Sequence, residues 1–421
     1  MRERVNSRSE RVEVGIPRRG LSTCDVALIG CGLVGKEVVR QLSSPRLSKI
    51  FRIVSLSNSR HTVSLDPTAA SLDADALLAL LPSSSSPLPA SSSHPGIRYS
   101  AADPSQIIES MAASSRTTGR NAVLIDCTST LSVPSLYPSA LSAGVSVVTP
   151  NKKGFASSAD LHGAIRDAQA GEGAGLCYAE ATVGAGMPIH TTLKDLIATG
   201  DEVVKIEGVF SGTLSYLFNQ FSPAAEDGIE PRKLSKIVRE AKEHGHTEPH
   251  PADDLSGSDV ARKLTILARY VSNSSSSSTA SSLPALPSLP DGYLSVPTQS
   301  LIPASLANVR DPADFVAGLA EFDDEFDRLR DEAKAEGKVL RYVGVLDRTK
   351  GEIRCGLERY PLNHPFASLS GSHLSLAFHT KRYSARPLIV QGPGYPLEVT
   401  AMAVVADCVR VAERRGARLG L

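Results

Sequence analysis

The densest run of polar residues in the chain lies between residues 243 and 263. It contains the carboxylates Glu248, Asp254 and Asp259, and it ends at Lys263. Asp259 and Lys263 are four residues apart, so they share one face of a helix. The apolar stretch 264–268 that follows predicts a buried helix. A buried lysine among carboxylates can exchange a proton near neutral pH, because desolvation disfavours its charge. A solvated surface ion pair is the plainer alternative.

The same run contains three histidines that could suggest a zinc site. His244, His246 and His250 follow a spacing that breaks any helical HxxxH face, and prolines follow them. We therefore interpret the histidines as bystanders in a shaped loop, and we predict no catalytic metal there.

A glycine loop provides the second chemical signal. Gly30, Gly32 and Gly35 have GxGxxG spacing, directly after an apolar strand and at the start of a helix. Such a loop permits a tight turn, lets backbone approach a pyrophosphate and presents helical N–H groups to it. An ordinary glycine turn is the alternative. The strand–turn–helix context favours a dinucleotide site, which would also include Leu33 and Val34.

The end of the second strand bears on which dinucleotide binds. Residues 55–61 read SLSNSRH and contain no acidic residue, whereas NAD-specific proteins usually place an acid there for the ribose 2′-hydroxyl. Arg60 could pair with a 2′-phosphate, which favours NADP or tolerance of both cofactors. A solvated loop arginine is the equally good alternative.

Polar residues follow two further strands. Thr128 and Lys152 each come just after an apolar strand, where ligands bind in open α/β sheets. Glu180 begins a turn rich in small residues, and its irregular backbone could offer carbonyl oxygens to a cation. From the residues alone, a tight glycine turn is the better interpretation of that segment.

The elements that must position these residues differ between the two halves of the chain. In the first half strands alternate with helices, which predicts a parallel sheet with right-handed crossovers. The expected strands are 25–29, 51–56, 123–127, 145–149 and 176–180, with helices at 34–42 and 134–143. The second half predicts an α+β domain with a mixed or antiparallel sheet. Its expected helices are 231–244, 259–270 and 322–336, its strands are 339–346, 352–360, 375–379 and 388–391, and an amphipathic helix at 399–415 packs back onto the first domain.

Composition excludes several classes of protein. The chain has 421 residues, 41% of them hydrophobic, and its 45 basic residues balance 45 acidic ones. A neutral chain does not suit a duplex-coating protein, and no apolar run is long enough to span a membrane. The six cysteines are far apart and form no CxxC pair, which favours a reducing compartment, so we expect a cytoplasmic protein. We interpret residues 1–21 as a flexible tail, and the Ser/Pro-rich segments 82–95 and 272–290 as passive insertions.

Several segments, taken in order over most of residues 24–421, resemble the monofunctional homoserine dehydrogenases, especially the fungal type. They are ALIGCGLVGKEVVRQL, DCTST, VTPNKKGF, YAEATVGAGMPI, GVFSGTLSYLFN, TEPHPADDLSGSDVARKLTILAR and the closing QGPG and EVTA. The resemblance implies an α/β protein, with a Rossmann-type dinucleotide-binding domain and a second α+β catalytic and dimerisation domain. It also implies NAD(P)-dependent interconversion of L-aspartate 4-semialdehyde and L-homoserine, in threonine and methionine biosynthesis, by a homodimer.

The resemblance also implies roles for single residues. Lys263 matches the proton donor of the family, and Glu248 and Asp259 match the residues that hold the substrate. Asp254 matches a residue that supports the site, and Lys152 matches a lysine beside cofactor and substrate. Further matches to cofactor-contacting positions are Gly30, Gly32, Leu33, Val34, Gly35, Thr128, Gly245 and Gly394. A monovalent cation, sodium in this family, would be held by Glu180, Val183, Ala185 and Met187.

From these features we expect a dinucleotide-binding domain over residues 22–187 and 389–421, and a catalytic domain over residues 188–388. One departure concerns the closing motif, which has Pro396 where the family commonly has glycine. Proline lacks an N–H to offer a ligand, so a non-catalytic NADP-binding paralogue with a regulatory or scaffold role is one alternative. A dehydrogenase of another small amino-acid aldehyde is the other. No nucleic-acid or membrane partner is expected.

Overall fold

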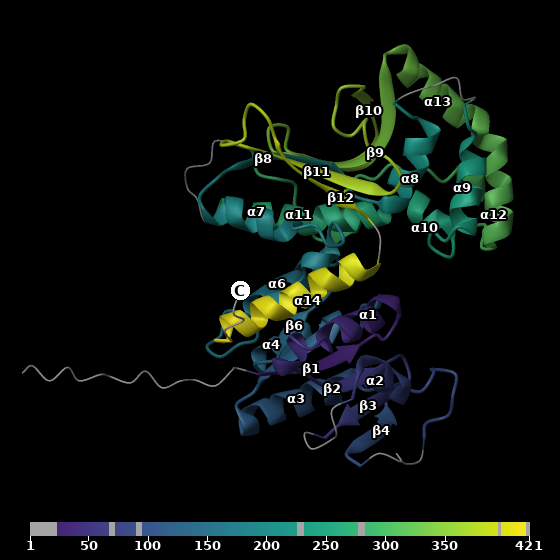
Figure 1. Cartoon of the computed structure of the whole chain (residues 1–421). Coiled ribbons are helices and arrows are strands. Elements are labelled where there is room, and N and C mark those ends of the chain that lie inside the picture. The colour runs from purple at the N-terminus through teal and green to yellow at the C-terminus, as the bar shows by residue number, and fades with distance from the viewer. Residues whose placement is uncertain are drawn as a thin grey trace, which may run out of the picture.

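The computed structural model describes residues 23–66, 72–89, 95–224, 231–276, 283–394 and 397–417. Two domains are stacked one above the other, with the C-terminal helix lying between them (Figure 1). The expected tail at residues 1–21 lies outside the described part of the chain. None of the described helices is long and apolar enough to cross a membrane.

The first domain is built on a seven-stranded sheet in the order β4-β3-β2-β1-β5-β6-β7. Its strands are β1 (Cys24–Ile29), β2 (Phe51–Ser57), β3 (His61–Leu65), β4 (Ile97–Ala101), β5 (Asn121–Asp126), β6 (Ser146–Val148) and β7 (Cys177–Tyr178). Strands β1, β2, β5, β6 and β7 run parallel, as predicted. Because β2 and β5 lie on opposite sides of β1, the strand order reverses there, and ligands of such sheets bind at that point.

Helices cover both faces of this sheet, and they bury its central strand on both sides. Val26 and Leu28 of β1 pack with α1 (Leu33–Leu42) and α14 (Leu397–Arg414), whereas Ala27 and Ile29 pack with α3 (Pro104–Thr118) and α4 (Tyr137–Ser142). The predicted return of the last helix to the first domain is thus confirmed. The remaining helical segments are η1 (Leu47–Lys49), α2 (Ala74–Leu80), η2 (Pro134–Leu136), α5 (Lys153–Ala156), α6 (Ala159–Asp167) and η3 (Glu180–Thr182).

The second domain has a five-stranded antiparallel sheet in the order β10-β9-β8-β11-β12. Its strands are β8 (Val203–Val209), β9 (Lys338–Asp347), β10 (Glu352–Pro361), β11 (His373–Thr380) and β12 (Leu388–Pro393). Its helical segments are α7 (Ile189–Ala198), α8 (Gly212–Phe221), α9 (Leu234–Glu243), α10 (Pro251–Leu255), α11 (Ser258–Ser276), η4 (Gly292–Ser295), η5 (Ala304–Leu306), α12 (Pro312–Gly318), η6 (Leu319–Phe322) and α13 (Asp323–Ala335). Helices α7 and α11 lie between this sheet and the first domain (Figure 1).

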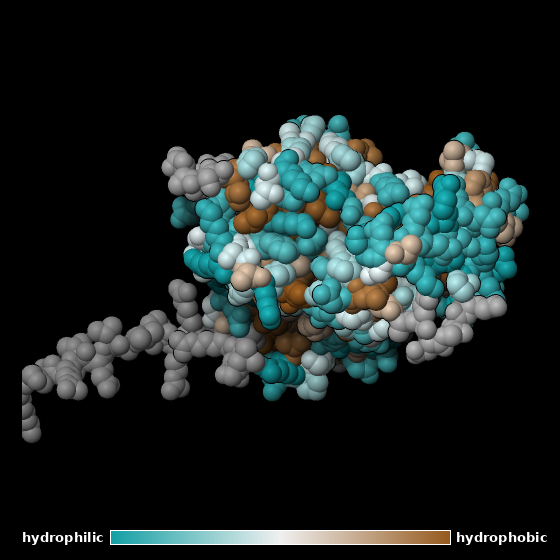
Figure 2. All heavy atoms as spheres, turned by 90° about the horizontal axis from the view of Figure 1, so that it is seen from above, coloured by the Kyte–Doolittle hydropathy of each residue, from teal (hydrophilic) through white to brown (hydrophobic). Residues whose placement is uncertain are grey.

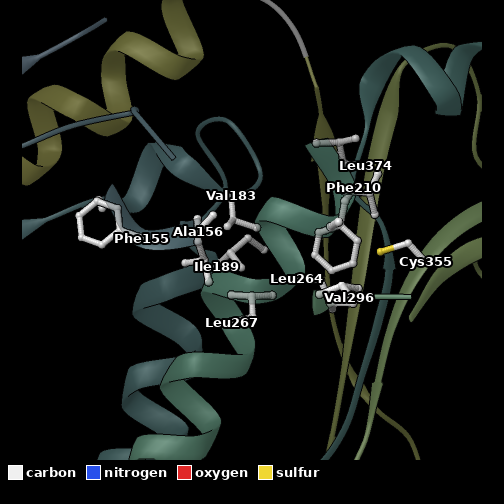
Figure 3. Close-up of a cluster of buried hydrophobic side chains, with 14 of the residues drawn as sticks. Phe155, Ala156, Val183, Ile189, Phe210, Leu264, Leu267, Val296, Cys355 and Leu374 are labelled. Carbon is white, nitrogen blue, oxygen red and sulfur yellow. The ribbon is translucent and has the colours of Figure 1, made fainter. Parts of the chain in front are cut away.

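Helix α11 is held by hydrophobic contacts on several sides. Leu264 and Leu267 lie in one cluster with Phe155 of α5 and with Phe210, which follows β8 (Figure 3). Residues 264–268 are at most 2% exposed, which confirms the prediction that this helix is buried. Fully burying a leucine side chain stabilises the fold by roughly 1.5–3 kcal/mol, so the helix position is firmly determined. This packing positions Lys263, one residue before the apolar stretch.

Several boundaries differ from the sequence-based expectation. Strands β3 and β4 were missed, and both run antiparallel to their neighbours, so the first sheet is mixed rather than wholly parallel. The expected strand 176–180 shortens to Cys177–Tyr178, because Glu180 begins a 3-10 turn. Residues 389–393 belong to β12 of the second sheet, and therefore only α14 returns to the first domain.

The two Ser/Pro-rich segments are less passive than expected where the structure describes them. Helix α11 continues to Ser276 instead of ending near residue 270. The carbonyls of Leu283 and Pro284 accept hydrogen bonds from Arg348, and Leu286 packs against the main core. The prolines and leucines after the serine run supply carbonyls and apolar surface, which the emphasis on serine overlooked. Residues 90–94 and 277–282 lie outside the described part of the chain.

Candidate active site

A cleft of about 700 Å³ lies between the two domains and collects half of the residues singled out from the sequence. We call it the catalytic cleft. Its lining includes Val34, Thr128, Lys152, Ala185, Glu248, Asp254, Asp259, Lys263 and Gly394. The first domain contributes the segments that follow β1, β5 and β6. The second contributes the start of α8, the α10 region and the first turn of α11. Stretches that are far apart in sequence therefore meet around one space.

Lys263 projects from the first turns of α11 into this cleft. Its Nζ donates to the carbonyl oxygen of Phe210 at 2.7 Å and pairs with Asp259 Oδ2 at 2.7 Å. The Lys263 side chain is only 13% exposed, so the plainer alternative of a solvated surface pair does not describe it. An ammonium has three donors, and these contacts use two of them. The third can serve a ligand in the cleft.

Asp259 lies between two lysines. Its Oδ1 is 3.3 Å from Lys152 Nζ, and its other oxygen binds Lys263, although 41% of the side chain faces the open cleft. Burial opposes ionisation of Asp259, but the two lysines outweigh it and hold its pKa well below the usual range. Burial lowers the pKa of Lys263, and the charge of Lys152 acts in the same direction, while Asp259 opposes both. The arrangement supplies a lysine from which a proton leaves more readily than in water.

Glu248 and Asp254 form the far wall of the cleft. The Asp254 carboxylate accepts from the backbone N–H of Glu248 at 2.8 Å, which ties the loop to α10. Burial raises the pKa of Asp254 to about 6, even though this hydrogen bond works against the shift. Because Asp254 is occupied by the loop backbone, the Glu248 side chain is the acid of this pair that is positioned to meet a ligand.

The glycine loop has the geometry that a dinucleotide requires. Gly30 has a φ of +97°, and a Cβ there would lie 2.7 Å from the backbone of Cys127. A Cβ on Gly35 would lie 2.3 Å from the carbonyl oxygen of Gly30, so this glycine permits close packing of helix and loop. A Cβ on Gly32 would meet open space. Gly32 therefore leaves its backbone accessible, and the adjoining Leu33 is 73% exposed above it.

A buried polar network under the cleft is centred on Asp126, and its connections could not be predicted from the sequence. Asp126 is 0% exposed and accepts from the Tyr137 hydroxyl at 2.5 Å, from Asn151 Nδ2 at 3.1 Å and from the Thr128 backbone at 2.8 Å. Burial raises the pKa of Asp126. The network fixes the ends of β5 and β6, and with them Thr128 and Lys152. Asn151 directly precedes Lys152, and Asp126 lies two residues before Thr128 at a strand end that the sequence already placed near the crevice.

Further lining residues were also missed. Ser211, Gly212 and Thr213 at the start of α8 face the cleft, as does Arg262. Ser211 caps α8 by accepting from the Leu214 N–H, and the Ser-Gly-Thr sequence before an apolar run is a recognisable helix start. Arg262 stacks over the ring of Tyr293 with its Cζ 4.2 Å from the centroid.

Arg60 does not line the catalytic cleft. It lies in the hairpin between β2 and β3, where its backbone N–H donates to Asn58 Oδ1 at 2.9 Å. Asn58 in turn donates to the carbonyl of Pro82 at 2.7 Å, and His61 Nε2 is 2.9 Å from the carbonyl of Ser86. The first Ser-rich segment therefore lies beside the end of β2, where the ribose of a dinucleotide is expected.

The Glu180 carboxylate acts mainly as a structural anchor. It accepts from the His190 N–H at 2.7 Å, from the backbone and hydroxyl of Thr191, and lies 3.4 Å from Arg410. It thus joins the start of α7 to α14. Of the expected cation-binding positions, Ala185 lines the cleft and is the non-glycine residue with positive φ, 55°, in the described part of the chain. Val183 and Met187 are buried in the same turn.

The remaining candidates are two glycines and the histidines of the polar run. Gly394 lies against the start of α8, since a Cβ there would be 3.3 Å from Gly212 Cα, whereas Pro396 lies outside the described residues. Gly245 has a φ of +71° and ends α9 with open space around it. His250 caps α10, and the ring of His246 packs on Tyr216. Across the described ranges, no three His, Cys, Asp or Glu side chains cluster as a metal site would require.

Comparison with known families accounts for both domains. Residues 30–179 match the family model described as homoserine dehydrogenase, NAD binding domain, and residues 188–409 match the model described as homoserine dehydrogenase. A homoserine dehydrogenase of Paracoccidioides brasiliensis is 42% identical over 394 residues, which cover 93% of this chain and 98% of the relative.

Solved structures give the same picture. A Candida auris protein of unknown function is 36% identical, with a TM-score of 0.78 over 93% of this chain and 99% of that one. A hyperthermophilic archaeal homoserine dehydrogenase in complex with NADPH is 19% identical, with a TM-score of 0.62 over 93% and 98% of the two chains. The second likeness is evidence for the fold alone.

Proposed function

This chain belongs to the homoserine dehydrogenase family, and we propose that the residues of its catalytic cleft interconvert L-aspartate 4-semialdehyde and L-homoserine with NAD(P). The observation that carries the proposal is the Lys152–Asp259–Lys263 cluster, which lies in one cleft with Val34 of the glycine loop and Thr128 after β5. A non-catalytic paralogue would have no need of a buried lysine with a lowered pKa in that place.

The nicotinamide supplies the hydride when aldehyde is reduced, and the protein must supply the proton. We assign that proton to Lys263 Nζ, whose third donor position is free of the contacts to Phe210 and Asp259. The proton moves to the aldehyde oxygen as the carbon gains its hydride, directly or through one water, and no covalent intermediate is needed. In the reverse direction the neutral amine accepts the proton of the alcohol. The lowered pKa of Lys263 makes both directions accessible.

The walls of the cleft match the two charges of an amino-acid substrate. The carboxylates of Glu248 and Asp259 attract the α-ammonium group by charge. The N-terminal turn of α8, at Ser211–Thr213, lies in the same cleft, and its peptide dipoles favour an anion such as the α-carboxylate. Holding the α-ammonium and α-carboxylate groups orients the substrate. Its aldehyde then lies beside Lys263 and faces the glycine loop.

We further propose that NADP is the preferred cofactor. The glycine loop fits a dinucleotide, because Gly32 leaves its backbone accessible and Gly35 permits the required packing. The hairpin after β2 has Arg60 and no acid, and the serine segment beside it provides hydroxyl groups at residues 83–86. Arg60 and these hydroxyls would hold the 2′-phosphate.

A monovalent cation, sodium in related enzymes, is proposed at the turn after η3. The Glu180 carboxylate is engaged by α7 and Arg410, so carbonyl oxygens of Val183, Ala185 and Met187 are the better ligands. The positive φ of Ala185 supports this choice, because such strained backbone persists only where its surroundings maintain it. The ion would stabilise the turn that connects the two domains.

We also propose a cytoplasmic homodimer. Strand β12 lies at an open edge of the second sheet, and Leu388–Val390 within it are only half-buried. Viewed from above, the second domain shows hydrophobic patches among a mainly hydrophilic surface (Figure 2). Mass measurement in solution, with twice the 44.5 kDa chain mass expected, tests the oligomeric state.

An assay of NADPH oxidation tests the activity directly. The purified protein should oxidise NADPH when L-aspartate 4-semialdehyde is added, and should reduce NADP with L-homoserine. Aldehydes that lack the α-amino group serve as controls, because Glu248 and Asp259 would have no ammonium to bind. Activity only with another amino-acid aldehyde would favour the neighbouring dehydrogenase, and binding of NADPH without any turnover would favour the paralogue.

A further inference from the structure

A second cavity, of about 410 Å³, opens on the outer half of the first domain's sheet. Strands β2, β3 and β4 form its floor and helix α3 forms its wall, so we call it the α3 cavity. It shares no lining residue with the catalytic cleft. No step of the proposed reaction uses it.

The cavity exists because of the way the outer strands are connected. Strands β2, β3 and β4 follow one another as an antiparallel meander, so no crossover helix is needed between β2 and β3. Helix α3 packs instead over β1 and β5, with Ile107 and Met111 turned toward the core. In the described part of the chain the sheet beyond β1 is therefore left open on this face.

Strand register places a row of polar side chains on that open face. Ser55 pairs with Ala27 on one side and with Ser64 on the other, and Ser64 pairs with Arg98. Ala27 packs in the core beneath α3, and directly paired residues point to the same face, so the whole row points toward the α3 side. Ser110 and Ser114, one turn apart on α3, face the row from the wall.

The Ser55 hydroxyl lacks a hydrogen-bond partner. Ser55 is 6% exposed and lines the α3 cavity, and its Oγ is buried without a partner. Leaving a buried hydroxyl unsatisfied costs roughly 1–3 kcal/mol. The neighbouring Thr62 hydroxyl shows the usual situation, since it binds Ser57 Oγ at 2.9 Å. An unsatisfied serine in the floor of a cavity indicates a polar group that binds there.

Charged side chains of both signs line the cavity, and a further arginine, Arg120, pairs with one of its aspartates. One carboxylate, Asp25, is shared by Arg52, at 2.8 Å, and Arg120, at 2.7 Å, so two cations share one anion. Asp103 at the rim caps α3 by accepting from the Gln106 N–H. The lining itself holds two arginines, Arg52 and Arg98, and two aspartates, Asp25 and Asp103. Because Asp25 pairs with Arg52 and Asp103 caps α3, Arg98 is the lining cation without a carboxylate partner among the described residues.

We propose that the α3 cavity binds a small anion that bears a carboxylate or a phosphate. The guanidinium group of Arg98 pairs with its charge, and the hydroxyls of Ser55 and Ser64 hydrogen-bond to its oxygens. Guanidinium groups suit carboxylate and phosphate equally, because both present paired oxygens. Ile107 and Met111 leave an apolar side for the rest of the molecule.

Thermal melts of the NADPH-bound protein, with binding checked by calorimetry, test the proposal. Saturating NADPH occupies the glycine loop, which is itself able to bind phosphate. Inorganic phosphate and acetate are titrated separately, each against chloride at equal ionic strength. At 10–100 times its Kd a bound anion should raise the melting temperature of the 421-residue chain by about 1–3 °C, and the rise should saturate. The anion that responds identifies the charged group.

Two substitutions place the binding in the α3 cavity. Arg98→Gln should abolish the anion-dependent rise, whereas Arg386→Gln, which removes another exposed arginine elsewhere, should keep it. Ser55→Ala should raise the melting temperature without anion, because it removes the unsatisfied hydroxyl, and should weaken the anion response. If neither anion exceeds chloride with the wild-type protein, or if Arg98→Gln responds as the wild type does, the proposal is wrong.

Discussion

Lys263 shows how much of the chemistry depends on single side-chain neighbours. Its proton affinity results from burial and Lys152, which lower the pKa, and from Asp259, which opposes them. Its position is set by the Phe210 carbonyl, which belongs to a distant part of the chain. The residue type and the helical spacing pointed to Lys263, whereas Phe210 carried no chemical signal in the sequence.

Replacing Lys263 tests this assignment. Lys263→Ala should lower kcat by at least ~100-fold, since general acid–base catalysis is typically worth ~10²–10⁴. Lys263→Arg keeps the charge beside Asp259 but cannot release a proton at neutral pH, so it should be similarly slow. Stopped-flow turnover and NADPH titration measure the two variants, and the Kd for NADPH should change little. Substantial turnover in Lys263→Arg would exclude proton transfer by this residue.

Asp254 should make stability depend on pH. Its folded pKa of about 6 lies above the ordinary value of 3.8, so the folded state holds this proton more tightly than the unfolded state does. The contribution of Asp254 to the free energy of unfolding therefore falls as pH rises from about 4 to about 6. Two units correspond to about 3 kcal/mol.

Asp254→Asn removes that dependence while keeping an oxygen to accept from the Glu248 N–H. Denaturant unfolding at pH 4, 5, 6 and 7.5 should show the variant gaining stability relative to the wild type, with most of the gain between pH 4 and 6 and only a small further gain by pH 7.5. A constant difference at all four values would mean that Asp254 titrates normally.

Arg60 is the residue to test for cofactor choice. Arg60→Ala should weaken NADPH binding more than NADH binding, because only NADPH carries the 2′-phosphate. A lost charge-assisted hydrogen bond of about 1.5–3 kcal/mol corresponds to roughly a tenfold or hundredfold rise in the NADPH Kd. Fluorescence titration with each cofactor gives the comparison. Equal weakening of both would show that Arg60 does not contact the phosphate.

At the scale of elements, two glycines of the glycine loop have different roles: one keeps the cofactor's approach open, and the other is needed for the fold. Gly32→Ala places a methyl group in open space, at a backbone φ of −78° that alanine adopts freely, so the fold should tolerate it. The same methyl group occupies the approach of a pyrophosphate, so the NADPH Kd should rise at least about tenfold, which is 1.4 kcal/mol.

Gly35→Ala is the contrasting variant. Its methyl group would lie 2.3 Å from the Gly30 carbonyl, which forces α1 away from the loop. We expect a lower melting temperature as well as weaker binding, measured by thermal melts with and without NADPH. If both variants melted alike, the distinction drawn from the geometry would be wrong.

At the scale of the whole molecule, Glu180 connects the domains. It is 5% exposed and joins the start of α7 in the second domain to Arg410 of α14, which packs on the first. Glu180→Ala should therefore lower the free energy of unfolding by about 1–3 kcal/mol, because the buried α7 amides lose their acceptor, whereas Arg410 keeps its closer partner Asp407. Glu180→Gln, which keeps one acceptor oxygen, should lose less.

The cation is tested with the same proteins. If carbonyls of Val183, Ala185 and Met187 hold sodium, the wild type should melt higher in sodium than in a large organic cation at equal ionic strength. Glu180→Ala should melt lower in both salts yet retain part of the sodium effect. Identical wild-type melting curves in the two salts would count against a bound ion.

The sequence by itself determined what is local. Strand–glycine–helix order identified the dinucleotide loop, the apolar stretch after Lys263 identified a buried helix, and four-residue spacing paired Asp259 with Lys263. These features depend on backbone periodicity and on contacts within one or two turns, so a single segment carries the information. Strands β3 and β4 were missed because five-residue strands are too short to show a clear periodicity.

Only the tertiary structure decided how distant segments meet. It brought Lys152 against Asp259, Phe210 against Lys263, and Glu180 against α7 and α14, and it located the end of the second domain after β12. It also set the pKa directions, which depend on burial and on charges from other elements. Strand register placed Ser55 and Ser64 in one row with Arg98. Such contacts arise when many weak apolar interactions fix whole elements at once, and no single stretch of sequence contains that sum.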